Sequence, residues 1–262
     1  MFAVRLRFWI AALGLALAGC GSTPSSDKDS AEKLYADARE DMAAGSYDRA
    51  IKTLERVEGR AAGTLLSQQA ALDLAYAYWK TNERAQALST LDRFIKVHPS
   101  SPALDYALYL KGLVNFNDSI GILSTISRQD LSERDQQASR DAYQAFKQLV
   151  DQFPNSRYSA DGRLRMDYIV NALAQYELHV ARYYYRRGAY LAAANRAQQA
   201  VRDYQQTPSI EEALYILAQS YDKLGLKDLS ADADRVLKQN YPDSRFLREG
   251  LRTADNPWWK FW

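Results

Sequence analysis

Cys20 is the residue with the clearest chemistry, because it is the only cysteine in the 262-residue chain. It follows Leu17, Ala18 and Gly19, and small residues directly before a cysteine are typical of a lipobox. Cleavage there would make Cys20 the first residue, with a diacylglycerol thioether on its sulfur and an acylated amine. Each buried CH₂ group contributes about 0.8 kcal/mol, so several acyl chains would hold the protein on a membrane. The alternative is an ordinary secretory signal with a chance cysteine.

The residues around Cys20 agree with this interpretation. Residues 1–19 contain a basic start (Arg5, Arg7) and an apolar run of eleven residues, 8–18, which is too short to span a bilayer as a helix. Residues 20–30 are polar and predict an acylated tether. Cys20 is followed by Gly21 and not by an aspartate. By resemblance to bacterial lipoproteins, this pattern implies that the protein proceeds to the outer membrane, where its fold faces the periplasm.

Residue types that catalyse reactions form no constellation elsewhere. The chain has two histidines, His98 and His179, and neither has a spaced partner for a metal or a nucleophile. No G-x-S-x-G, P-loop or G-x-G-x-x-G motif occurs. The formal net charge is +2, and 32 basic and 32 acidic residues are interspersed after residue 20. We therefore expect no enzyme, no metal, no cofactor and no nucleic-acid partner.

A cluster rich in arginine and tyrosine is the best candidate for binding chemistry. Residues 182–190 hold three arginines and four tyrosines, and Arg196 follows within an alanine-rich stretch. Protein interfaces favour both residue types at their cores. A helix C-terminus that attracts cations is the alternative explanation for residues 182–190, and a solvated position is the alternative for Arg196.

The elements that position these residues follow a repeated frame. Ala87, Ala142 and Ser230 each stand twelve residues before a proline, and Ala50 and Ala193 begin weaker copies. A small residue allows two helices to approach closely, and the proline ends the second helix. Four residues that tolerate a positive φ mark the turns inside the pairs: Gly45, Asn82, Gly188 and Gly225. The sequence predicts an all-α fold, a right-handed superhelical stack of about five tetratricopeptide-like hairpins with about ten helices.

This frame divides the mature chain into four parts. Repeats 1–3 cover residues 31–156, and repeats 4 and 5 cover residues 157–245. Residues 117–131 interrupt the third repeat with a long loop, which either packs back on the fold or contacts a partner. Residues 157–187 predict one long helix with the apolar seam Met166, Ile169, Leu173, Tyr176, Val180 and Tyr183.

Phe246 and Leu247 are expected to cap the stack. Residues 246–262 end in a tryptophan-rich tail, 257–262, that docks on the last hairpin, touches a partner or rests at a membrane.

Together these features resemble the BamD (ComL) family, outer-membrane lipoproteins of the β-barrel assembly machinery. The resemblance covers residues 1–245 and is carried by the lipobox, by the inserted third repeat and by five stretches: 72–78, 87–99, 105–113, 153–158 and 176–196. The chain departs from the family pattern at Gln206-Thr207-Pro208 and in the tail.

The resemblance implies a function and site residues. It implies a scaffold that binds the periplasmic domain of the BamA-type barrel protein and other lipoprotein subunits, and helps insert and fold outer-membrane proteins. Tyr184, Arg187 and Arg196 are then expected to face BamA. Tyr76, Tyr78 and Tyr106 are expected to line a groove for unfolded outer-membrane proteins. The alternative function is a tetratricopeptide lipoprotein that scaffolds peptidoglycan-processing enzymes.

Overall fold

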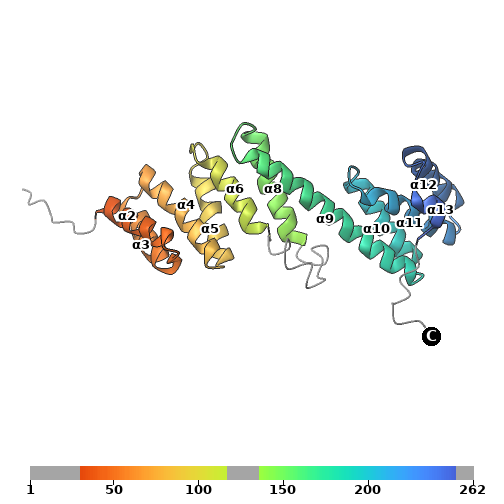
Figure 1. The fold of residues 1–262 in the computed structure, drawn as a ribbon, viewed down its shortest axis with the longest axis horizontal. Coiled ribbons are helices and arrows are strands. Elements are labelled where there is room, and N and C mark those ends of the chain that lie inside the picture. Colours follow the sequence, from red (N-terminus) through yellow and green to blue (C-terminus); the bar gives the residue numbers. More distant parts are fainter. Residues whose placement is uncertain (1–29, 117–135, 252–262) are drawn as a thin grey trace, which may run out of the picture. The chain divides into compact units, whose positions relative to one another are not determined.

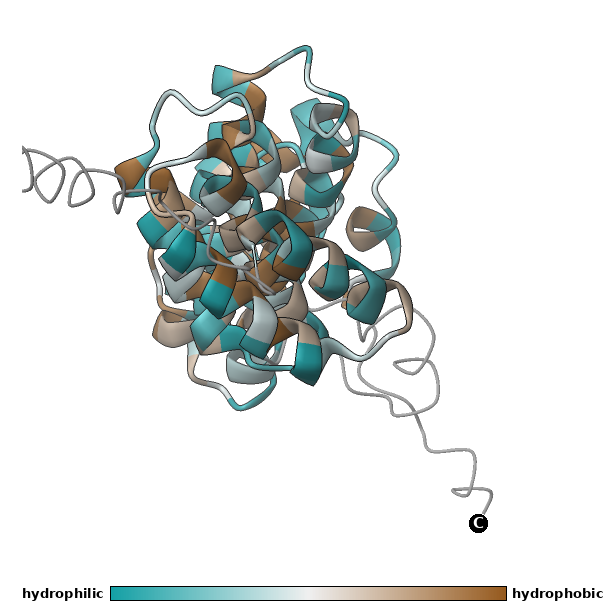
Figure 2. Cartoon of the chain, turned by 90° about the vertical axis from the view of Figure 1, so that its left-hand side faces the viewer, coloured by the Kyte–Doolittle hydropathy of each residue, from teal (hydrophilic) through white to brown (hydrophobic). Residues whose placement is uncertain are grey.

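The computed structural model describes residues 30–116 and 136–251, and these residues form eleven helices (Figure 1). They divide into two compact units at the peptide between Thr81 and Asn82. The helices carry both hydrophobic and hydrophilic residues, as amphipathic helices do (Figure 2). Cys20, the loop 117–131 and the tail 257–262 lie outside the described residues.

The first unit contains three helices: α2 (Ala31–Ala43), α3 (Tyr47–Arg60) and α4 (Leu65–Lys80). The hydroxyls of Ser30 and Thr64 accept hydrogen bonds from backbone N–H groups and cap α2 and α4. The core combines small and branched side chains, with Ala50 fully buried at the predicted close approach. Its main members are Leu34, Ala38, Leu54, Val57, Ala70, Leu74 and Ala77.

The second unit contains eight described helices. They are α5 (Arg84–Val97), α6 (Leu104–Asn115), α8 (Gln136–Gln152), α9 (Ser159–Arg186), α10 (Tyr190–Asp203), α11 (Ser209–Lys223), α12 (Lys227–Asn240) and α13 (Arg245–Glu249). Each packs against the next in the chain from α5 to α12; α9 also contacts α11, and α13 lies against α11. Phe246 is buried and its ring lies 5.9 Å from that of Tyr215, so the predicted cap at the end of the stack is confirmed.

The predicted tetratricopeptide-like, all-α fold is confirmed by these hairpins. Asn82 adopts φ 65°, and the three turn glycines, Gly45, Gly188 and Gly225, adopt φ values of 74°, 75° and 76°. Asparagine is one of the few residues other than glycine that enter this region at low cost. Ser230 donates a hydrogen bond from its hydroxyl to the Ala218 carbonyl at 2.9 Å, which explains a serine at a small-residue position.

The predicted long helix is confirmed as α9, with 28 residues, but one member of its predicted seam, Tyr183, is wrong. Ile169 and Leu173 are buried as expected, whereas Tyr183 is 51% exposed. Beyond Leu173 the buried face moves to Ala174, Glu177, Leu178 and Ala181. An α-helix with 3.6 residues per turn drifts about 20° per heptad from a strict seven-residue repeat. The neighbours also change, from α8 along the first half of α9 to α10 and α11 along the second.

Candidate partner-binding surface

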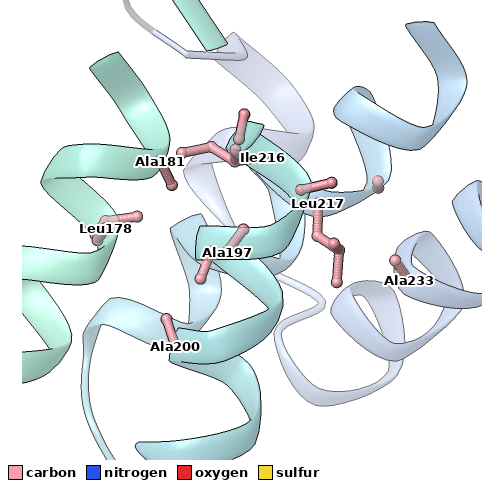
Figure 3. Close-up of a cluster of buried hydrophobic side chains, with 11 residues drawn as sticks. Leu178, Ala181, Ala197, Ala200, Ile216, Leu217 and Ala233 are labelled. Atoms are coloured by element: carbon pink, nitrogen blue, oxygen red, sulfur yellow. The ribbon is translucent and has the colours of Figure 1, made fainter. Parts of the chain in front are cut away.

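A core of small side chains supports the surface that α9, α10 and α11 share. Four alanines of α10 are at most 1% exposed: Ala193, Ala194, Ala197 and Ala200. They lie opposite Leu178 and Ala181 of α9 and Ile216 and Leu217 of α11 (Figure 3). Small residues allow the three helix backbones to approach closely. Polar side chains at the rims of these helices are therefore held within reach of one another.

Arg196 projects from α10 toward α9. Its Nη1 donates a hydrogen bond to Oε2 of Glu177 at 3.1 Å. The Glu177 side chain is 1% exposed, whereas that of Arg196 is 39% exposed. The structure thus gives Arg196 a carboxylate in its own chain while leaving part of its guanidinium in contact with solvent.

A second ion pair joins α9 to α11. Arg182 donates from Nε and Nη2 to the two carboxylate oxygens of Glu212, at 2.7 and 2.8 Å. The Glu212 side chain is 10% exposed. This two-bond geometry is the strong form of an arginine–carboxylate pair. The pair lies beside a pocket of about 460 Å³ that His179 and Phe246 also line.

The end of α9 presents aromatic and cationic side chains together. Arg187 is exposed, and its guanidinium lies 5.2 Å from the ring centre of Tyr183. Tyr184 is half-buried against the alanine core, with its ring 5.7 Å from that of Tyr183. Leu191, at the start of α10, is 61% exposed. Sequence reasoning placed Tyr183 both in the cluster 182–190 and in the apolar seam, and it gave no role to Leu191.

Tyr185 lies on the inner side of the same helix end. Its ring is 5.6 Å from that of Tyr190. Burial raises the pKa of its hydroxyl, with a further contribution from Tyr215. Tyr185 is therefore a packing residue of the second unit, and Tyr183 and Arg187 form the outward part of the tyrosine–arginine cluster.

The three tyrosines expected to line a peptide groove lie in different units. Tyr76 and Tyr78 are on α4 of the first unit, and Tyr106 is on α6 of the second. Tyr76 packs edge-on against Tyr47 and Trp79, at 6.2 and 5.8 Å between ring centres. The Tyr78 hydroxyl donates to Oε1 of Glu55 at 2.7 Å. All three side chains are partly exposed.

Tyr106 begins a row of aromatic rings in the second unit. Its ring lies 5.5 Å from that of Tyr158, which stacks on Tyr109 at 4.8 Å. The guanidinium of Arg157 covers the Tyr158 ring at 4.7 Å. Tyr109 and Tyr158 also pack against the buried cluster of Leu104, Leu108 and Leu149, so Tyr106 adjoins the core of the second unit.

Among the side chains of residues 30–116 and 136–251, no group of three or more His, Cys, Asp or Glu could hold a metal ion. His98 instead lies beside the Phe94 ring, at 5.3 Å.

Comparison with known proteins supplies the family. The family model YfiO, described as an outer membrane lipoprotein, matches residues 27–237. The outer membrane protein assembly factor BamD of Neisseria meningitidis serogroup B is 48% identical over 95% of this chain and 96% of its own length. The chain belongs to the BamD (YfiO) family. The BamD of Pasteurella multocida is 34% identical over 88% of this chain and 89% of its own length.

Membership of the BamD family confirms the resemblance drawn from the lipobox and the repeats. Among solved structures, the crystal structure of MamA protein matches 86% of this chain at 14% identity and a TM-score of 0.34. The fold assignment therefore rests on the helices themselves. Within residues 30–116 and 136–251, no helix is both long enough and apolar enough to cross a membrane.

Proposed function

We propose that this BamD-family chain is a non-enzymatic scaffold of the outer-membrane β-barrel assembly machinery. Its likeness to proteins named outer membrane protein assembly factor, across nearly the whole chain, supports this assignment. Stacked helical hairpins provide extended surfaces for binding other proteins. Cys20 would carry the lipid anchor at the outer membrane and leave the repeats in the periplasm.

The second unit provides the docking surface for the periplasmic domain of the BamA-type barrel protein. Tyr184, Arg187 and Arg196 contribute to it. The observation that supports this role is the exposed guanidinium of Arg187 above the exposed ring of Tyr183. Arginine and tyrosine are enriched among the residues that contribute most to binding at protein interfaces.

Unfolded outer-membrane proteins engage the aromatic surfaces of both units, through Tyr76 and Tyr78 in one and Tyr106 in the other. Unfolded barrel segments are amphipathic, and exposed aromatic rings suit their apolar side chains. Other lipoprotein subunits of the machinery bind the remaining repeats.

Charge reversal of Arg187 tests the docking surface. Arg187→Glu removes the cation above Tyr183 and puts a carboxylate in its place, so it is expected to lower the amount of barrel protein recovered by about tenfold. Arg157→Glu is a matched control, because Arg157 also covers a tyrosine ring, 4.7 Å away, and is exposed at the other end of α9. Both variants are expressed in full length, extracted in detergent and used to pull down partners. Equal recovery with the Arg187 variant would contradict the proposed surface.

A further inference from the structure

Glu177 is a buried carboxylate whose partner lies on the next helix. Its side chain is 1% exposed and comes from the middle of α9. A buried charge is strongly unfavourable unless it is paired. Glu177 accepts a hydrogen bond from Nη1 of Arg196. The buried Glu177 carboxylate therefore restricts the position of the Arg196 side chain.

The geometry of this pair leaves the binding edge of Arg196 open. Glu177 uses Nη1, and within the described residues Nε and Nη2 of Arg196 make no hydrogen bond. Nε and Nη2 form the edge that Arg182 uses to hold both oxygens of Glu212. In Arg182 that edge is satisfied inside the chain, whereas in Arg196 it remains available.

The alanines next to Arg196 on α10 do not compete for this edge. Ala193, Ala197 and Ala200 of the same helix are fully buried and carry no polar side-chain atom. The Arg196 side chain is 39% exposed, while its Nη1 is hydrogen-bonded to the buried Glu177. A side chain held in this way loses less conformational freedom when it binds a partner than a free arginine does.

We propose that Glu177 is a positioning residue that fixes Arg196 so that its Nε–Nη2 edge points to a hydrogen-bond acceptor on the docked protein. This inference rests on the proposed function, because it takes Arg196 as part of the surface that binds the BamA-type periplasmic domain. Glu177 itself does not touch the partner. It acts by orienting the guanidinium and by compensating part of its charge.

The test uses the full-length chain in detergent and the isolated periplasmic domain of the BamA-type protein as the probe. Glu177→Met keeps the side-chain volume and removes the acceptor, and its unpaired Arg196 can still be hydrated. We expect about tenfold weaker binding for Glu177→Met and a smaller loss for Glu177→Gln, which retains an acceptor oxygen for Arg196. Glu212→Met is the matched control, because it removes the buried acceptor of the neighbouring arginine and leaves Arg196 unchanged.

A double-mutant cycle separates orientation from packing. If Glu177 acts through Arg196, Glu177→Met weakens binding in the native background and causes no further loss in an Arg196→Ala background, where it only removes a buried carboxylate that has lost its partner. A loss of equal size in both backgrounds would assign Glu177 a structural role and overturn the proposal. If Glu177→Met loses helical circular dichroism, the same cycle with Glu177→Gln decides.

The failure of the inference and the failure of the proposed function give different results. Weaker binding by Arg196→Ala with normal binding by both Glu177 variants would overturn the positioning role and leave the docking surface in place. Normal binding by Arg196→Ala would remove Arg196 from the surface, and the role of Glu177 would be overturned with it. No binding by the native chain would overturn the proposed function.

Discussion

Buried carboxylates connect neighbouring helices in both units. Asp73, Glu177 and Glu212 are buried, and each accepts a hydrogen bond from a side chain on another helix. In the first unit the Tyr35 hydroxyl donates to Oδ2 of Asp73 at 2.6 Å, and Arg39 lies 3.4 Å from the same oxygen. Because an unpaired buried charge is costly, each pair favours one register between the two helices that it joins.

Tyr35 should make the first unit sensitive to alkaline pH. Burial, and then the hydrogen bond to Asp73, raises its pKa from 10.0 to about 12. A raised pKa means that folding favours the protonated hydroxyl, so this stabilisation is complete below pH 10 and is lost as the pH rises through about 12. We expect the free energy of unfolding to fall less steeply over this range in Tyr35→Phe than in the native chain. Urea unfolding of both at several pH values measures the difference. Tyr183→Phe, at a tyrosine 51% exposed, is the control, and the same reduction in it would contradict the assignment to Tyr35.

The sequence showed which residues are charged but not which charges pair. Glu177 and Arg196 are 19 residues apart, and Tyr35 and Asp73 are 38 apart. No periodicity within one helix links such positions, because the pairing depends on how two helices rotate against each other. Arg196 was singled out from its contrast with the surrounding alanines, whereas nothing local distinguished Glu177 from exposed glutamates.

At the scale of helices, the local sequence predicted where helices end better than it predicted which helix faces are buried. The turn residues and the length of α9 followed from glycine, asparagine and proline positions, since backbone conformation is a local property. The buried face of α9 beyond Leu173 did not follow, because it depends on which helices surround it. Gly112 was likewise unremarkable in the sequence, although a Cβ there would overlap the ring of Phe146.

Gly112→Ala should therefore destabilise the contact between α6 and α8. Phe146 is fully buried, so its ring can move aside only by displacing neighbouring core residues. Overpacking of this kind typically costs about 1–3 kcal/mol, more than the gain of about 1 kcal/mol from replacing glycine by alanine in a helix. Gly59→Ala is the control, because Gly59 lies within α3 and its added Cβ would have no neighbour within 4 Å. Thermal unfolding should show a lower midpoint for the first variant and an unchanged or higher midpoint for the second. A Gly112→Ala midpoint equal to the native one would contradict the close packing.

At the scale of the whole molecule, the repeat frame and the lipobox predicted the fold class and the family. They did so because small residues, turn residues and prolines recur at spacings that depend little on the rest of the chain. The partner surface was less predictable, since exposure depends on tertiary packing: Tyr183 and Leu191 emerged from the structure, and Tyr185 proved to be a packing residue. The proposed scaffold function is therefore tested through the partners of the chain.

The most direct test of the central claim is the identity of the protein that co-purifies with the native full-length chain after detergent extraction. The account predicts a BamA-type barrel protein, identified by mass spectrometry and recovered in an amount comparable to the chain itself. Recovery of a cell-wall synthase or hydrolase in its place, with no barrel protein, would contradict membership of the barrel assembly machinery and favour a scaffold for peptidoglycan-processing enzymes.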